Sequence, residues 1–227
     1  MLVHGTRIFD ERPTRLHFQV EFAMGTESLK PILNGTARWT VYPSGRIELT
    51  TDASVAEHEI FQHRKGPVDF FLPRFGLQLT MPSYMDQVAY FGYGPEESYI
   101  DKHISTTCGL YETNVDKMFE NYPMPQENGA HYGTRWVDLT DAFGMGLHVA
   151  SEKPISFNAS RYSIEEIRQA AHPFQLKSDD HVVVQLDYMQ SGIGSGSCGA
   201  QLLPPYQLNE REFRYHVQLE PIMKEDL

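Results

Sequence analysis

The chain has 227 residues, of which 41% are hydrophobic, and its 19 basic and 30 acidic residues give a net charge of −11. A chain of this length can bury a large core without disulfides, so we predict one globular domain over residues 1–227. The acidity disfavours nucleic acid and anionic membranes as partners, because both are polyanions that bind basic surfaces.

The sequence carries no mark of export or membrane insertion. Its apolar runs are far shorter than a membrane span, and its first residues, MLVHGTRIFDERP, lack the basic start and apolar stretch of a signal peptide. With only Cys108 and Cys198, the sequence holds no disulfide framework. We therefore expect a cytoplasmic protein in a reducing compartment.

Alternation of apolar and polar residues dominates the chain and predicts antiparallel strands that are buried on one face. The first such segment is RLHFQVEF at 15–22. ARWTVYPSGRIELTTDASV at 37–55 reads as two strands around a Pro-Ser-Gly turn, which predicts a hairpin. Later in the chain, HVVVQLDYM at 181–189 and EFRYHVQLEP at 212–221 repeat the alternation.

One segment is typical of a helix. In SRYSIEEIRQAAH at 160–172, Ser163 and Glu166 have the spacing of a capping box, and apolar residues after Ser163 share one helical face. Turn signals recur elsewhere, at Asn34-Gly35, in FGYGP at 91–95 and in PQENG at 125–129. We therefore predict an all-β protein, a large antiparallel sandwich with long loops and one short helix.

The stretch SGIGSGSCG at 191–199 is unusual, because four glycines and three serines surround one cysteine. It does not fit a phosphate-binding loop, which needs a helix after it, since LPPY at 203–206 places two adjacent prolines downstream. A nucleophilic Cys198 would need a histidine partner that the sequence does not indicate. A tight surface turn between strands is the simpler interpretation.

Other candidate sites have little support. No Cys-x-x-Cys or His-Glu-x-x-His motif occurs, and His58 and His63 have a spacing that suits neither a strand face nor a helical turn, so we predict no metal site. Acidic residues in GPEESY at 94–99 and in the 125–129 segment could form a carboxylate pair, but their turn composition favours structural roles. The aromatic residues could stack on sugar rings or fill the core.

Four blocks taken together are more specific than any single motif. In chain order they are FGYGPEESYIDKH (91–103), PMPQENGAHYGTRWVDL (123–139), NASRYSIEEIRQAAH (158–172) and LDYMQSGIGSGSCG (186–199). Together they resemble the C-terminal domain of the large, multidomain β-galactosidases of glycoside hydrolase family 2, often described as the β-galactosidase small-chain domain. The resemblance runs from about residue 15 to residue 219.

The resemblance implies a galactose-mutarotase-like β-supersandwich that takes part in the hydrolysis of β-D-galactosides such as lactose. In this family the catalytic glutamates lie on a separate (β/α)₈ barrel, a fold of about 250 residues for which this chain has no room. We therefore expect no catalytic residue and no cofactor in this chain, with Mg and Na bound by other domains of the parent enzyme. The expected partners are those other domains, or a large subunit, and the galactoside substrate.

The resemblance also implies a role for the glycine-rich loop. In well-known family members the loop that corresponds to 192–199 reaches the mouth of the active site and carries a tryptophan that stacks on the sugar. We expect Cys198 to face the substrate pocket here, and a thiol offers far less stacking area than an indole. Weaker binding of the leaving-group sugar is therefore expected. The substrate-binding residues expected in this loop are Ser195, Gly196, Ser197 and Cys198.

We assign the polar residues of the matching blocks to loop architecture or to docking between domains, because polar side chains in loops usually bind backbone groups. They are Tyr99, Asp101, Glu127, Asn128 and Arg135. Two other functions stay open, namely an independent carbohydrate-binding or sugar-processing module, and an assembly domain that does not contact the pocket. A docking domain should expose an apolar surface for its missing partner, whereas an independent module should not.

Overall fold

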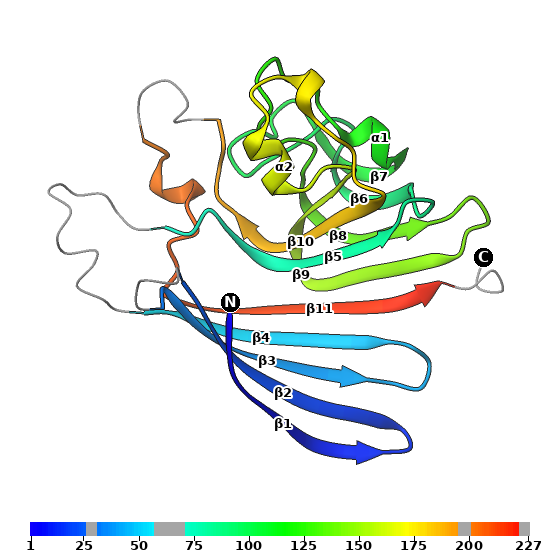
Figure 1. Ribbon diagram of the computed structural model, residues 1–227, viewed down its shortest axis with the longest axis vertical. Helices are drawn as coiled ribbons and strands as arrows, with labels where there is room; N and C mark the ends of the chain where they lie inside the picture. The colour runs from blue at the N-terminus through cyan, green and yellow to red at the C-terminus, as the bar shows by residue number, and fades with distance from the viewer. Residues whose placement is uncertain (26–30, 57–70, 195–200, 223–227) are drawn as a thin grey trace, which may run out of the picture. The chain divides into compact units, whose positions relative to one another are not determined.

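The computed structural model describes residues 1–25, 31–56, 71–194 and 201–222 (Figure 1). The chain divides into two compact units, which we call unit 1 (Met1–Leu72 with Leu208–Glu220) and unit 2 (Pro73–Gln207 with Pro221–Leu227). Antiparallel strands make up most of both units, so the predicted all-β class is confirmed. The division does not test the single-domain prediction for residues 1–227, which stays a prediction.

The described strands of unit 1 pair antiparallel in the order β1-β2-β3-β4-β11 (Figure 1). The predicted strands at 15–22 and 212–221 and the hairpin at 37–55 are confirmed. The hairpin turns at Gly45, whose φ of 87° is a left-handed conformation that glycine adopts without steric cost. The strands are β1 (Leu2–Arg12), β2 (Arg15–Met24), β3 (Leu33–Val41), β4 (Ile47–Val55) and β11 (Glu212–Ile222).

A continuous row of hydrophobic residues, which we call the apolar row, crosses the strands of unit 1. Directly paired residues of neighbouring antiparallel strands share a face of the sheet. Within the row, the rings of Phe18 and Trp39 stack with their centroids 6.3 Å apart. The outer end is open, since Ile8 on β1 is 60% exposed. From β1 to β11 the row is Ile8, Phe18, Trp39, Leu49 and Val217.

The described strands of unit 2 pair antiparallel in the order β5-β10-β9-β8-β6-β7 (Figure 1). Short helical segments lie in the connections, and α1 packs against β9. The strands are β5 (Arg74–Pro82), β6 (Gln87–Gly94), β7 (Thr107–Asn114), β8 (His131–Thr140), β9 (Gly146–Ser160) and β10 (His181–Gln190). The α-helices are α1 (Val115–Met118) and α2 (Ile164–Gln169), and the 3₁₀ turns are η2 (Pro173–Gln175) and η3 (Pro204–Tyr206).

The helix predicted at 160–172 forms only in its middle, as α2. Its N-cap is the predicted one, because the Ser163 hydroxyl accepts a hydrogen bond from the Glu166 N–H at 3.1 Å. The helix stops at Gln169 because Pro173 cannot continue it and favours extended backbone just before itself. The structure also contains a second helix, α1, so the prediction of one helix is wrong. Within the described ranges, no helix is long and apolar enough to cross a membrane.

Strand β10 is buried on both faces. Val182, Val184 and Leu186 form the apolar face that the alternation predicts, and each is 0% exposed. The opposite face carries the polar residues Gln185 and Asp187, which are also buried. The Arg74 guanidinium donates to Asp187 on this second face, and this contact helps to fix the strand that leads to the glycine-rich loop.

Two of the predicted turns are corrected, because one lies wholly within a strand and the other does so in its first four residues. Asn34-Gly35 belongs to β3, and the first four residues of the 91–95 segment end β6. A Cβ added to Gly35 would lie 2.3 Å from the Phe22 ring, and one added to Gly94 would lie 2.2 Å from the Tyr90 hydroxyl. These glycines therefore make room for large neighbouring side chains.

Candidate functional site

The four residues predicted to contact the substrate, Ser195, Gly196, Ser197 and Cys198, lie outside the described residues. The structure does describe residues 191–194, which connect β10 to them and which we call the stem. The stem and the groups that bind it are therefore the part of the predicted site that the structure places.

The first two amides of the stem are bound by backbone carbonyls. The Ser191 N–H donates to the carbonyl of Pro73 at 2.9 Å, and the Gly192 N–H donates to the carbonyl of Tyr206 at 2.8 Å. Pro73 directly precedes β5, and Tyr206 ends the η3 turn. The stem thus begins between two segments that are far from it in sequence.

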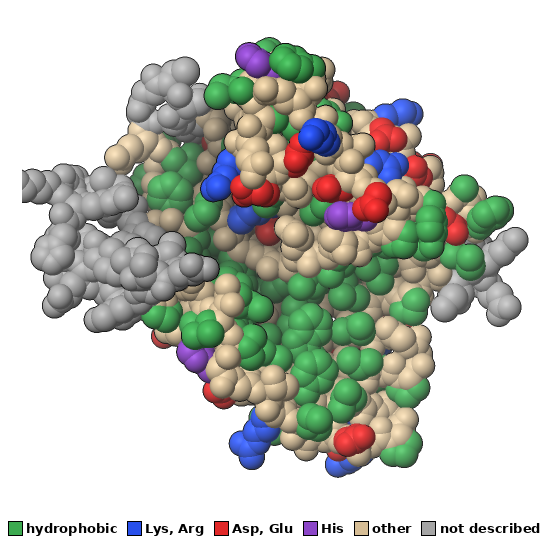
Figure 2. Space-filling model, in the orientation of Figure 1, with side chains coloured by type: hydrophobic (Ala, Val, Ile, Leu, Met, Phe, Trp, Pro, Cys, Tyr) green, Lys and Arg blue, Asp and Glu red, His purple; other side chains and the backbone are tan. Residues whose placement is uncertain are grey.

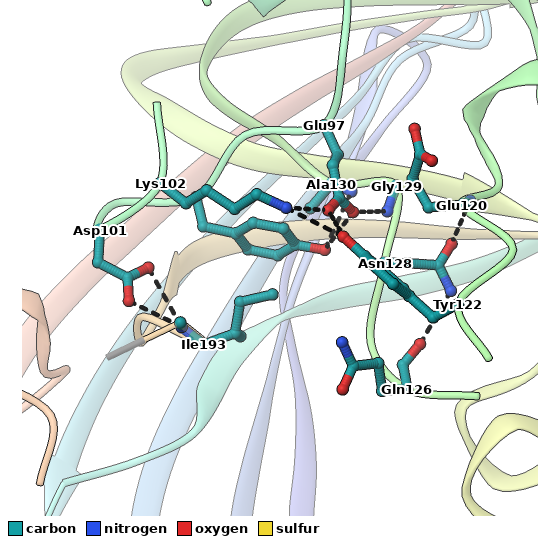
Figure 3. Close-up of polar contacts among 12 residues, drawn as sticks. Glu97, Asp101, Lys102, Glu120, Tyr122, Gln126, Asn128, Gly129, Ala130 and Ile193 are labelled. Atoms are coloured by element: carbon teal, nitrogen blue, oxygen red, sulfur yellow. Dashed lines mark hydrogen bonds and ion pairs between the residues drawn. The ribbon is translucent and has the colours of Figure 1, made fainter. Parts of the chain in front are cut away.

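The next two amides of the stem are bound by a single side chain. The Ile193 N–H donates to Oδ1 of Asp101 at 3.2 Å, and the Gly194 N–H donates to Oδ2 of Asp101 at 2.9 Å (Figure 3). A carboxylate has two acceptor oxygens, and here each of them takes one of two consecutive amides. Asp101 is therefore the last described contact before the chain enters the predicted substrate-binding residues.

Gly192 is in the closest contact with Asp101. A Cβ added to Gly192 would lie 2.5 Å from Cγ of Asp101 and 2.6 and 2.7 Å from its two oxygens, so the Asp101 carboxylate would have to move. At Gly194 an added Cβ would lie 3.5 Å from Oδ2 of Asp101, an ordinary contact. The two glycines therefore differ, and only at Gly192 would an added Cβ displace the Asp101 carboxylate.

We expect Gly192→Ala to push the Asp101 carboxylate away from the stem, whereas Gly194→Ala should be tolerated. Moving the carboxylate breaks the two hydrogen bonds that Asp101 accepts from the stem, so the Gly192→Ala protein should be destabilised by about 1–3 kcal/mol. Urea unfolding of both variants against the wild type measures the difference. Equal stability of the two variants would contradict the close approach of Gly192 and Asp101.

Asp101 itself lies in a tight turn. Tyr99 and Lys102 exchange two backbone hydrogen bonds of 2.9 Å, which close the turn around Asp101. Beyond the turn, the His103 ring lies with Nδ1 3.0 Å from the Tyr99 carbonyl, and the Thr106 hydroxyl donates to the His103 carbonyl at 2.8 Å. These contacts hold the backbone of Asp101 in place before its side chain meets the stem.

Glu97 joins this turn to the 122–129 segment. Its side chain is 4% exposed and accepts hydrogen bonds from the Lys102 ammonium, the Tyr122 hydroxyl and the Gly129 N–H (Figure 3). Burial acts to raise the pKa of this carboxyl, but the hydrogen bonds outweigh it, so the pKa of Glu97 is lowered below its ordinary value. Glu97 is therefore an ionised carboxylate with a structural role.

The Asn128 side chain shapes the same segment. Its Oδ1 accepts a hydrogen bond from the Glu120 N–H at 3.0 Å, and its Nδ2 donates to the Gln126 carbonyl at 2.8 Å (Figure 3). Gly129 follows with a φ of 75°, a conformation that favours glycine. The architectural role predicted for Asn128 agrees with these contacts.

A buried cluster of charges fixes β10 just before the stem. Arg74 on β5 donates from Nε to Oδ2 of Asp187 at 3.0 Å, donates to the same oxygen from Nη2, and donates from Nη1 to Glu127 at 3.1 Å. The side chains of Arg74 and Asp187 are 18% and 7% exposed. Burial raises the pKa of Asp187, and the charge of Arg74 opposes that rise.

An open groove of about 640 Å³ lies in unit 1 and has acidic residues in its wall. One of them, Asp52, is paired with Arg38 and with Arg214 at 2.6 Å. The hydrogen bond from Arg214 is the main reason that the pKa of Asp52 is lowered. A carboxylate held ionised in this way is suited to structure and not to proton transfer.

The residues considered for a metal site are not brought together. His58 and His63 lie outside the described residues. In the parts of the chain that the structure places, no three His, Cys, Asp or Glu side chains form a group that could hold a metal ion. The expectation of no cofactor in this chain is not tested by this observation and stays a prediction.

The geometry defines an antiparallel all-β protein in which a buried polar network fixes the approach to one glycine-rich loop. The family described as "Beta galactosidase small chain" matches residues 6–219 of the sequence. The chain therefore belongs to the β-galactosidase small-chain family, as the resemblance of its sequence blocks predicts.

Curated relatives are β-galactosidases. The one from Staphylococcus xylosus is 34% identical over 218 residues, which cover 94% of this chain and 21% of that protein. The one from Actinobacillus pleuropneumoniae is 35% identical over 205 residues, which cover 90% of this chain and 19% of that protein. The chain thus spans about a fifth of the length of these relatives.

Two solved structures are similar in fold at low sequence identity. A GalM/aldose epimerase homologue from C. elegans has a TM-score of 0.45 and 8% identity, covering 96% of this chain and 68% of that one. A galactose mutarotase related enzyme from Lactobacillus acidophilus has a TM-score of 0.40 and 10% identity, covering 96% of this chain and 71% of that one.

Sequence reasoning places Asp101 and Glu127 in architectural roles but does not find their partners. Asp101 contacts residues more than 90 positions away, and spacing along the chain gives no sign of such a contact. Arg74, which pairs with Glu127, lies outside every matching block. The loop position predicted for Arg135 is wrong, because this residue lies within strand β8.

Proposed function

We propose that this chain is the C-terminal domain or the small subunit of a β-galactosidase, and that it helps to shape the pocket in which β-D-galactosides such as lactose are hydrolysed. The observation that carries this proposal is the extent of the match. The family covers residues 6–219, while the chain spans about a fifth of its curated relatives. The rest of such an enzyme would supply the catalytic glutamates, so the chain is not catalytic alone.

The proposed contribution to the pocket is the loop of residues 195–198, with Cys198 facing the substrate. The anchored stem supports this role, because all four of its amides are hydrogen bonded. Fixing the entry to a binding loop lowers the ordering cost of ligand binding.

The apolar row of unit 1 supports docking onto another domain of the same galactosidase. It ends at β1, the outermost described strand of unit 1, where Leu2, Val3 and Phe9 are 61%, 49% and 49% exposed. Figure 2 shows hydrophobic side chains gathered over the strands of this unit. Exposed apolar surface of this kind is typical of a protein interface, and it favours a docking domain over an independent module.

The test is galactoside hydrolysis by the purified chain, alone and mixed with the remaining domains of its galactosidase. We expect no hydrolysis from either component and hydrolysis from the mixture. Hydrolysis by the chain alone would contradict the proposal, since the chain should lack the catalytic residues. If the mixture is inactive but the chain binds galactose in a titration, the independent carbohydrate-binding module replaces the proposed function.

Cys198→Trp tests the pocket assignment in the active mixture. An indole stacks on a sugar with far more area than a thiol, so the affinity for glucose as an acceptor should rise about two- to tenfold. The matched control is Cys108→Trp, at the exposed cysteine on β7, which should leave the kinetics unchanged. Equal kinetics in both variants would contradict the placement of Cys198 at the substrate.

A further inference from the structure

The four contacts that hold the stem differ in kind. Three segments supply them, but the acceptors at Ser191 and Gly192 are backbone carbonyls, whereas Ile193 and Gly194 are both held by the Asp101 side chain. Of these contacts, those to Asp101 lie nearest to residue 195. They are also the contacts that a change of side chain can remove.

The contact requires a carboxylate and not only a side chain of that size. Each oxygen of Asp101 accepts a different amide, at 3.2 Å and 2.9 Å. An asparagine has the same shape, but its NH₂ group would point its own hydrogens at one of these amides. Hydrogen bonds to a charged acceptor are also stronger than those to a neutral one. Asparagine should therefore fail to replace Asp101 here.

The Asp101 carboxylate is prepared for this contact by the turn that carries it. The paired backbone of Tyr99 and Lys102 fixes the turn, and the Lys102 ammonium is bound to the buried Glu97. Gly192 leaves the space in which the carboxylate lies. The network in Figure 3 thus leads from a buried anion, through a rigid turn, to the two amides of the stem.

We infer that Asp101 is a positioning residue of the galactosidase, which sets the direction in which the stem delivers residues 195–198 to the pocket and so sets the affinity for the leaving-group sugar. This inference rests on the proposed function. In this scheme Asp101 acts through the stem and does not take part in the chemistry. Its loss should therefore raise KM more than it lowers kcat.

Asp141 provides a matched control. It lies in the turn between β8 and β9, and its carboxylate also accepts two backbone amides, from Phe143 at 2.8 Å and Met145 at 3.0 Å. Both of these amides donate to the same oxygen, Oδ1, so Asp141→Asn can keep both hydrogen bonds. Both Asp101→Asn and Asp141→Asn therefore remove one negative charge from a side chain that binds two amides. Only Asp101→Asn should lose one of its two hydrogen bonds.

The experiment measures lactose hydrolysis and amide hydrogen exchange in the complete, active galactosidase. For Asp101→Asn and Asp101→Ala, we expect KM for lactose to rise about five- to tenfold with kcat changed less than about twofold, on the scale of one lost hydrogen bond to a charged group. The peptide that contains Ile193 and Gly194 should exchange about tenfold faster. Asp141→Asn and Asp141→Ala should change neither quantity.

Two results would overturn the inference. An Asp101→Asn enzyme with wild-type KM, beside an Asp101→Ala enzyme with raised KM, would mean that volume and not the paired acceptor matters. Faster exchange in the stem with unchanged KM would make Asp101 a purely structural residue. Failure of the proposed function is seen separately, because the remaining domains would then hydrolyse lactose equally well without this chain.

Discussion

Replacing Arg74 with methionine is expected to destabilise the protein by about 3–5 kcal/mol, because it leaves the Asp187 carboxylate buried without its counter-charge. The Asp187 side chain is only 7% exposed, and Arg74 supplies two donors to its Oδ2. Methionine keeps much of the volume of the arginine stem, so the loss reports mainly on the charge. Urea unfolding followed by circular dichroism measures the change.

Two comparisons separate the buried charge from lost packing. The double variant Arg74→Met with Asp187→Asn should recover at least about 1 kcal/mol relative to Arg74→Met, since the neutral amide costs less to bury than an unpaired carboxylate. Arg161 is the matched control. Its side chain is also 18% exposed, but its partners Asp86 and Asp116 are 30% and 66% exposed.

Because water can replace a guanidinium beside exposed carboxylates, Arg161→Met should cost no more than about 1–2 kcal/mol. Equal losses at the two arginines would contradict the special role of burial at Asp187. The contrast matters for function, because Asp187 lies on β10 four residues before Ser191, where the stem begins. A weakened cluster should therefore loosen the same stem that Asp101 holds.

The strands could be predicted where their signal is local. Alternation with period two is set by the pleat of a single strand, so 15–22, 181–189 and 212–221 are found from their own residues. Asn34-Gly35 misleads because the reason for the glycine lies on another strand, in the ring of Phe22. A glycine that avoids a clash and a glycine that makes a turn look the same in sequence.

The candidate site could be predicted only as a set of segments. The resemblance selects the block at 91–103 and the block at 186–199, but it does not say that the carboxylate of Asp101 meets the amides of Ile193 and Gly194. That contact depends on the pairing of strands that are distant in sequence. The site residues themselves, 195–198, lie outside the described residues, so their contact with substrate stays a prediction.

Acid is expected to weaken unit 2 through His131, the first residue of β8. This ring is 2% exposed, with Nδ1 3.0 Å from the Tyr90 hydroxyl and 3.1 Å from the Tyr93 carbonyl. Burial lowers the pKa of His131 to about 4, and the hydrogen bond to Tyr93 and the charge of Glu97 only partly oppose this. The ring is therefore neutral in the folded protein at pH 7.

The sign of the effect follows from the two pKa values. An unfolded histidine binds a proton near pH 6.5, whereas folded His131 does so only near pH 4, so the unfolded state gains protons over that interval. The free energy of unfolding therefore has its full value, as far as His131 is concerned, above about pH 6.5. It falls by about 3 kcal/mol as the pH drops to 4. Glu96, Lys117 and Glu120 line the same small pocket, so a variant at His131 is needed to isolate the contribution of this ring.

Unfolding free energies measured from pH 7 to pH 4 test this in three proteins. In His131→Asn the amide can replace Nδ1 as a donor but cannot titrate, so its stability should fall by about 3 kcal/mol less than that of the wild type over this interval. The control His4→Asn makes the same substitution at an exposed position on β1, outside unit 2. Parallel curves for the wild type and His131→Asn would mean that water reaches the ring in the folded state. If the stability of the wild type falls more steeply with acid than that of His131→Asn, the His131 ring limits the acid tolerance of unit 2. The effect would reach the network that supports Asp101, because β8 directly follows the loop that is bound to Glu97.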